Sequence, residues 1–215
     1  MFKRIVAGSI TIAAIITLCW LSPSSAQTPG AAQANVLTDA EKAEGWRLLF
    51  DGRTLLGWVL RGGTARWGIE EGSIVAEATA ESSQIATAEE YTNFRLKVDF
   101  WPDQGLNSGV FLRGPRDPRA PVHQFSFYEV NIADDHKTFP TGSVVDLLRF
   151  DPAPKSVGQW NTYDILAEGN HLVVVLNGIT TVDVKNGLHY SGVIALQAWN
   201  TGKVRFRNIK IKPLP

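Results

Sequence analysis

The segment between Leu172 and Val184 constrains the fold of this chain most strongly. Leu172–Leu176 and Ile179–Val184 are rich in β-branched residues, and only Asn177-Gly178 separates them. A two-residue type I′ turn needs positive φ at both central positions, so Asn-Gly between two such runs is the strongest short-range signal of a β-hairpin. Two antiparallel strands are therefore predicted here.

The same strand character recurs along the chain. Between residues 94 and 100 every second residue is apolar, which is the period expected of a strand with one buried face. No amphipathic helix of about ten or more residues is predicted after residue 45. Many short strands separated by Gly and Pro are typical of an all-β sandwich or barrel. Further strands are predicted at residues 46–50, 110–113, 125–132, 162–167, 193–198 and 203–212.

The first 26 residues have the features of a signal peptide. Lys3 and Arg4 precede an apolar run from Ile5 to Leu21, and small residues ending at Ala26 follow it. This pattern predicts a secreted or periplasmic protein. The alternatives are a retained membrane anchor, for which the run is short, and a lipoprotein attached through Cys19. Residues 27–44 are predicted to be a flexible lead-in, and residues 45–215 a single domain.

Charge and cysteine content narrow the possible partners. The chain has 21 basic and 21 acidic residues, and loss of Lys3 and Arg4 with the signal peptide leaves about −2. Near-neutral charge without a basic block argues against a nucleic-acid partner. No second apolar segment is long enough to cross a membrane, so no membrane contact is predicted after cleavage. Cys19, which leaves with the signal peptide, is the only cysteine, so no disulfide is predicted.

Residues 127–134 hold the most informative polar side chains. On a strand, Glu129 and Asn131 share one face with Phe127, while the alternate residues are apolar and should face the core. A carboxylate, an amide and an aromatic ring on one surface are suited to binding sugar hydroxyls and stacking on a sugar ring. A solvated sheet face is the plain alternative.

Other polar residues extend this candidate surface. Arg113 lies in a predicted strand, on the face of Gly109 and Phe111, where it could be a fixed cation or one half of a surface ion pair. Trp160 opens a strand between two amides, and Gln197 interrupts an apolar one. The histidines that flank the Glu129 strand, His123 and His136, could each be a general base, a metal ligand or a loop residue.

Several familiar catalytic motifs are absent from the sequence: it contains no Gly-x-Ser-x-Gly, no Walker loop and no His-Glu-x-x-His. Retaining β-glucanases carry Glu-x-Asp-x-(x)-Glu along one strand, whereas here Glu129 is followed by Asn131 and Asp134. Because retention needs two carboxyl groups about 5–5.5 Å apart, the amide in the middle position and the shorter last acid, Asp134, argue against that mechanism.

A set of short segments, in a specific order and spacing, resembles the 3-keto-disaccharide hydrolase family from about Gly45 to Leu214. The segments that carry the resemblance are residues 45–52, 57–58, 67–72, 91–94, 107–113, 128–130, 158–163, 176–178, 196–197 and 206–211.

The resemblance implies a concanavalin A-like jelly roll of two antiparallel sheets. It also implies an enzyme that acts on glycosides oxidised to a ketone at C3. A C3 ketone acidifies the C2 proton, so a base can form an enolate that expels the C1 substituent, and water can add back afterwards. Such a site needs a base, a proton donor and either a divalent metal ion or a fixed cation beside the enolate.

Carried onto this chain, the resemblance implies that Glu129 is the acid/base or a metal ligand. Arg113 would hold the polarised oxygen or the sugar. His123, from its position just before the Glu129 strand, is the further catalytic candidate. Relatives usually read Glu-x-Gln-x-x-Asp, so Asn131 places its amide one methylene short. A non-catalytic carbohydrate-binding module and a ligand-free structural domain are the alternatives. The residues expected to bind or stack on the carbohydrate are Asn107, Asn131, Asp134, Trp160 and Gln197.

Overall fold

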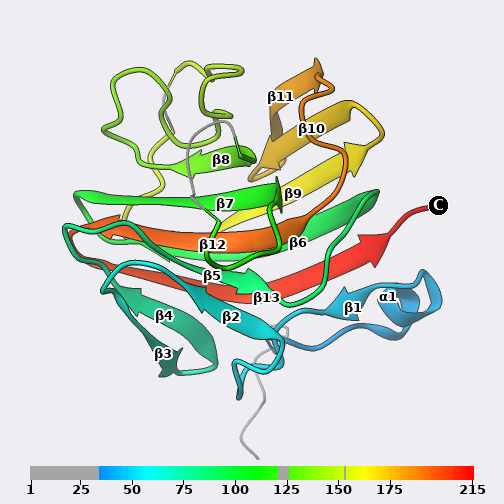
Figure 1. Cartoon of the computed structure of the whole chain (residues 1–215), viewed down its shortest axis with the longest axis horizontal. Coiled ribbons are helices and arrows are strands. Elements are labelled where there is room, and N and C mark those ends of the chain that lie inside the picture. The colour runs from blue at the N-terminus through cyan, green and yellow to red at the C-terminus, as the bar shows by residue number, and fades with distance from the viewer. Residues whose placement is uncertain (1–33, 121–125, 153) are drawn as a thin grey trace, which may run out of the picture. The chain divides into compact units, whose positions relative to one another are not determined.

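The computed structural model describes residues 34–120, 126–152 and 154–215, and it is almost entirely β (Figure 1). The predicted signal peptide, residues 1–26, lies outside these ranges. Within them, no helix has the length and apolar character needed to cross a membrane. The elements are α1 (Asp39–Ala43), β1 (Arg47–Leu48), β2 (Trp58–Arg61), β3 (Arg66–Glu70), β4 (Ser73–Glu77), β5 (Ser83–Thr87), β6 (Phe94–Pro102), β7 (Leu106–Gly114), β8 (Tyr128–Ile132), β9 (Asn161–Glu168), β10 (His171–Leu176), β11 (Ile179–Lys185), β12 (Val193–Asn200) and β13 (Lys203–Pro213).

These strands form two antiparallel sheets, which confirms the predicted β-sandwich. One has five strands in the order β2-β5-β12-β7-β8. The other has eight, in the order β11-β10-β9-β6-β13-β4-β3, with β1 paired to β13. Figure 1 shows the five-stranded sheet nearer the viewer. The predicted hairpin is β10–β11, and its turn residues Asn177 and Gly178 have φ of 50° and 84°.

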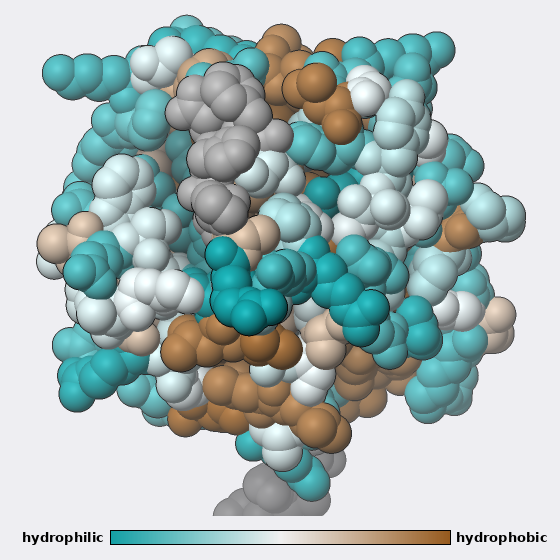
Figure 2. Space-filling model, viewed as in Figure 1, coloured by the Kyte–Doolittle hydropathy of each residue, from teal (hydrophilic) through white to brown (hydrophobic). Residues whose placement is uncertain are grey.

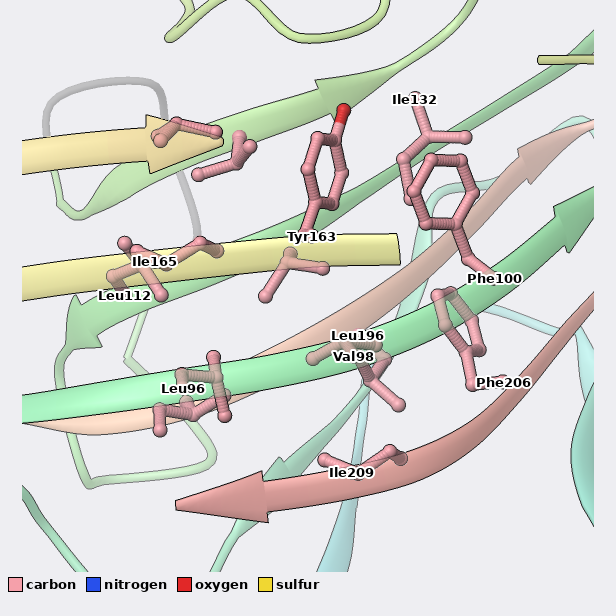
Figure 3. Close-up of a cluster of buried hydrophobic side chains, with 14 of the residues drawn as sticks. Leu96, Val98, Phe100, Leu112, Ile132, Tyr163, Ile165, Leu196, Phe206 and Ile209 are labelled. Atoms are coloured by element: carbon pink, nitrogen blue, oxygen red, sulfur yellow. The ribbon is translucent and has the colours of Figure 1, made fainter. Parts of the chain in front are cut away.

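The core fills the space between the sheets, where alternate residues of both sheets meet (Figure 3). Phe100 of β6 stacks on Tyr163 of β9, with ring centroids 4.6 Å apart. The Tyr163 hydroxyl is fully buried and donates to the main-chain carbonyl of Asn131 in β8, while the Gly142 N–H donates to it. A phenol of the large sheet thereby fixes the strand of the small sheet that carries Glu129.

Residues 34–44 of the predicted lead-in lie within the described ranges and make long-range contacts. Asn35 is buried and exchanges hydrogen bonds with Asn208 of β13, and it also donates to the Gly72 carbonyl. Helix α1 starts with a capping box formed by Thr38 and Glu41, and the Glu41 carboxylate pairs with Lys210. These contacts hold the described part of the lead-in against β13, and the flexibility of residues 27–44 as a whole stays a prediction.

Candidate functional site

The five-stranded sheet bears a cavity of about 490 Å³ on the face that points away from the core. Its floor is a row of residues directly opposite one another on the five strands, which run in the order Arg61, Gln84, Gln197, Gly109 and Asn131. Figure 2 shows hydrophilic residues gathered in a band across the middle of this face. A cavity of this size, lined by convergent polar groups, is the expected form of a small-molecule site.

Glu129 lies in the next row along β8, opposite Phe111 of β7, and its carboxyl group lines the cavity. No described residue hydrogen-bonds to or pairs with this carboxyl group. Burial, and in second place the negative charge of Asp146, raises the pKa of Glu129 from 4.5 to about 8. A carboxyl group in such a setting is a stronger base than usual once ionised, and a usable acid when protonated.

The apolar surroundings of Glu129 come from a small cluster on the same face. Phe111 and Phe127 stack with ring centroids 4.1 Å apart and an interplanar angle of 12°. Both rings are nearly buried, and Ala86, Val193 and Ala195 pack with them. This cluster is separate from the core between the sheets, and Phe111 and Phe127 line the cavity. Phe111 lies opposite Glu129, so the cluster contributes apolar surface beside its carboxyl group.

Two polar side chains can donate hydrogen bonds into the cavity. His136 Nδ1 accepts from the Phe139 N–H at 2.9 Å and the Thr138 N–H at 3.3 Å, so the proton of the neutral ring lies on Nε2. Asn107 is partly buried and its amide makes no hydrogen bond to another described residue. Both residues line the cavity.

Trp199 provides the aromatic surface at the rim. It lies opposite Asn107 on β12, is 42% exposed, and its indole N–H donates to the Ala80 carbonyl at 3.0 Å. A fixed, exposed indole beside polar groups is suited to stacking on a sugar ring.

The structure brings five of the candidate residues to the cavity: Asn107, Glu129, Asn131, His136 and Gln197. Gln197 is 6% exposed and donates to the Ser82 hydroxyl, but its Oε1 has no hydrogen-bond partner among the described residues. Asn131 is 1% exposed, and its amide donates to the Phe139 carbonyl. Asn131 therefore shapes the cavity floor, and its amide N–H is engaged in an internal bond.

Arg113 does not reach the cavity, so its expected placement is corrected. Its φ is 58°, and the β7–β12 pairing shifts register beside it, which breaks the alternation that would have placed it with Phe111. The guanidinium is buried and donates to the carbonyls of Thr92, Gly169 and His189. It holds loops together rather than offering a cation to a ligand.

Asp134 and Trp160 are also placed elsewhere. The Asp134 carboxylate accepts from the Ser156 N–H and hydroxyl and from the Thr141 hydroxyl, so it ties two loops together. Trp160 lies on the outer side of the large sheet, with the Arg207 guanidinium 3.8 Å from its ring centroid. His123 lies outside the described residues.

Sequence reasoning missed Arg61, Gln84, Trp199 and the role of Phe111. Arg61 and Gln84 lie on β2 and β5, two short strands that were not predicted. The signal for Trp199 was its position two residues after Gln197, on the same face of one strand.

The described side chains at the cavity are the candidate ligands of a divalent metal ion. Within the described residues no group of three or more His, Cys, Asp and Glu side chains could hold a metal ion. Glu129 has the charged Asp146 nearby, and His136, which also lines the cavity, already has its Nδ1 engaged. The divalent metal stays a prediction, and no step below depends on it.

Comparison with solved structures finds two similar proteins. Two proposed glycosyl hydrolases from Parabacteroides distasonis ATCC 8503 have similar structures. The first is 25% identical with a TM-score of 0.74, covering 85% of this chain and 100% of that one. The second is 27% identical with a TM-score of 0.64, covering 79% and 99%. A search of curated proteins gives no match.

More distant structures share the fold alone. The carbohydrate-binding module CBM66 from Bacillus subtilis is 19% identical with a TM-score of 0.57, covering 72% of this chain and 94% of that one. The β-glucanase of Bacillus licheniformis is 13% identical with a TM-score of 0.54, covering 74% and 94%. The predicted concanavalin A-like jelly roll is confirmed.

Residues 45–212 match the family described as the 3-keto-alpha-glucoside-1,2-lyase-like domain. The chain therefore belongs to the family of 3-keto-alpha-glucoside-1,2-lyase-like domains.

Proposed function

We propose that this protein cleaves glycosides whose sugar ring carries a ketone at C3, with Glu129 as the base that removes the C2 proton. The observation that carries the proposal is the Glu129 carboxyl group itself: it faces the cavity, no described residue pairs with it, and its pKa is raised to about 8. A base with a pKa close to the working pH is the most effective kind for proton abstraction.

The steps balance without any oxidant or covalent enzyme intermediate. The ionised carboxylate of Glu129 takes the C2 proton, and the electron pair of that C–H bond becomes the enolate of the C3 ketone. The enolate then forms the C1–C2 double bond as the C1–O bond breaks, and the leaving oxygen recovers one proton. Addition of water across the double bond completes a net hydrolysis.

The cavity residues supply the remaining roles. His136 Nε2–H and the Asn107 amide are donors that can bind the ketone or enolate oxygen or a ring hydroxyl. The unpartnered Oε1 of Gln197 can accept from a hydroxyl, and Trp199 can stack on the ring. The predicted signal peptide would place this reaction in the periplasm or outside the cell.

The test is to incubate the purified protein with matched glucosides and 3-keto-glucosides, both with added divalent metal ions and with a chelator. Release of the aglycone from the 3-keto form alone is expected, together with deuterium incorporation at C2 in D2O. Glu129→Gln should abolish both, while Glu168→Gln, which alters an exposed carboxylate on β9, should abolish neither. If the protein shows no cleavage and no C2 exchange in any metal condition, the proposal is overturned.

A sugar-binding module without catalytic activity is the second candidate. It is favoured by the lining of the cavity, which presents amides and the Trp199 indole rather than a pair of acids. In that case unmodified glycans would bind in a calorimetric titration, and Glu129→Gln would leave their affinity almost unchanged.

A further inference from the structure

Two arginines of this protein are buried without a carboxylate partner among the described residues, and they differ in one respect. Arg113 uses Nε, Nη1 and Nη2 to donate to main-chain carbonyls, and it lies away from the cavity. Arg61 is 5% exposed, lines the cavity, and donates to the carbonyls of Pro115 and Asp117 through Nη1 and Nη2 only. Its Nε has no hydrogen-bond partner among the described residues.

A buried cation with an unused donor is costly unless something compensates for it. The described carboxylate that acts electrostatically on Arg61 is that of Asp117. Asp117 is also paired with Arg119 at 3.4 Å, so two arginines share one carboxylate at this end of the cavity. Glu129 is the only carboxyl group among the described lining residues, and it lies at the far end of the sheet. The β2 end of the cavity is therefore cationic.

Position in the sheet separates Arg61 from the reacting ring. Arg61 is on the first strand of the five-stranded sheet and Glu129 on the last, four strand spacings away. At about 4.8 Å per spacing this is roughly 19 Å between backbones. The Glu129 carboxyl group lies over Gly109 of β7, three strand spacings from the backbone of Arg61, so we place the reacting ring at Glu129 and its C1 substituent towards Arg61. A group bound at Arg61 thus belongs to the part of the substrate that leaves.

The neighbours of Arg61 along the same row are equipped to hold a polar group there. Gln84 lies directly opposite Arg61, and Gln197 follows it with the unpartnered Oε1. We propose that the β2 end of the cavity is an anion subsite, in which Arg61 binds an acidic group on the aglycone. The preferred substrates are then 3-keto-glycosides with an anionic leaving portion. This inference rests on the proposed function and specifies its substrate class.

The experiment compares aglycones that differ in charge and little in shape. The 3-keto-glucosides of 4-hydroxybenzoate and 4-hydroxybenzamide are assayed side by side, with 4-hydroxybenzenesulfonate as the arm that separates a carboxylate from another anion. We expect kcat/KM to favour the anionic aglycones by about tenfold, because a charge-assisted hydrogen bond is stronger than a neutral one. The preference should shrink as salt is raised.

Variants and a binding measurement keep the inference separate from the proposed function. Arg61→Gln should remove the preference, whereas Arg53→Gln, at an exposed arginine outside the cavity, should keep it. The unoxidised glucosides are also titrated against the unaltered protein, which tests charge preference without catalysis and without relying on folding of the variant. Equal cleavage and equal binding of charged and neutral aglycones would overturn the anion subsite and leave the proposed function standing. Failure to cleave any 3-keto-glucoside, with the anionic aglycones still bound more tightly, would overturn the proposed function alone.

Discussion

Gly109 of β7 lies directly beneath the side chain of Glu129: a β-carbon at Gly109 would come within 3.0 Å of Glu129 Oε1 and 3.1 Å of its Cγ. Gly109 sits between Gln197 and Asn131 in the row that forms the cavity floor. The absence of a side chain there lets the carboxyl group lie close to the sheet. This contact leads to the first prediction.

Gly109→Ala should lower kcat/KM by about tenfold to a hundredfold, because a small displacement of a positioned catalytic group costs that much. The backbone at Gly109 is not in a left-handed conformation, so the melting temperature should change little. The control is Gly68→Ala in β3, where a β-carbon meets nothing within 4 Å. An unaltered kcat/KM in Gly109→Ala would show that the position of Glu129 is not critical.

The pH dependence of the rate distinguishes a base from an acid. With the Glu129 pKa at about 8, the fraction of ionised carboxylate rises tenfold per pH unit below that value and levels off above it. We expect kcat/KM for a 3-keto-glucoside to rise with a slope near one up to about pH 8. A rate that falls over the same range would assign Glu129 the role of the acid instead.

The free energy of unfolding should fall with pH over the range in which kcat/KM rises. In the unfolded chain Glu129 ionises above about pH 4.5, whereas the folded protein keeps the proton up to about pH 8. Between these values the unfolded state binds fewer protons, so the free energy of unfolding falls as pH rises, by at most about 1.4 kcal/mol per unit from this group. Glu129→Gln should remove that slope, and its advantage over the unaltered protein in urea unfolding should grow from pH 5 to pH 8.

Strand alternation explains which site residues the sequence could predict. β8 runs without a bulge, so Glu129 and Asn131 lie on the face opposite Val130 and Ile132, as the alternation predicts. In β7 the register shift near Arg113 breaks the same rule, and nothing in a period-2 pattern marks a residue with positive φ. The placement of the Arg113 side chain is therefore set by local backbone geometry, which the period-2 pattern does not reveal.

Sheet order explains what the sequence could not predict. Arg61 and Gln84 reach the site because β2 and β5 join β12 on one side while β7 and β8 join it on the other. Pairings between strands so far apart in the chain are set by the whole fold. Trp160 was expected at the site but lies elsewhere, for the same reason. An aromatic residue beside amides has the same sequence pattern on either sheet, and Trp160 lies on the outer side of the large one.

Replacing Arg113 should affect folding rather than catalysis. Arg113→Met leaves the carbonyls of Thr92, Gly169 and His189 without their buried donor, at a cost of at least about 3 kcal/mol. Urea unfolding should show this loss. At a temperature where the variant is still folded, its kcat should match that of the unaltered protein. A large fall in kcat with the stability intact would return Arg113 to the catalytic role implied by the resemblance.

The two tryptophans on opposite sheets should behave differently towards sugar. Trp199 is exposed at the cavity rim, so Trp199→Ala removes a stacking surface and should raise KM about twofold to tenfold, as expected for a contact of about 0.5–1.5 kcal/mol. Trp160 has one face covered by Arg207 and packs edge-on against Trp101, so Trp160→Ala should lower the melting temperature and leave KM unchanged.

The two variants are compared on one 3-keto-glucoside, with intrinsic fluorescence reporting ligand binding. The Trp199 indole is fixed at the cavity rim by its bond to the Ala80 carbonyl, so a bound sugar lies against it. Ligand should therefore quench the emission in the unaltered protein and in Trp160→Ala, but not in Trp199→Ala. Quenching that disappears with Trp160 instead would place the sugar on the large sheet.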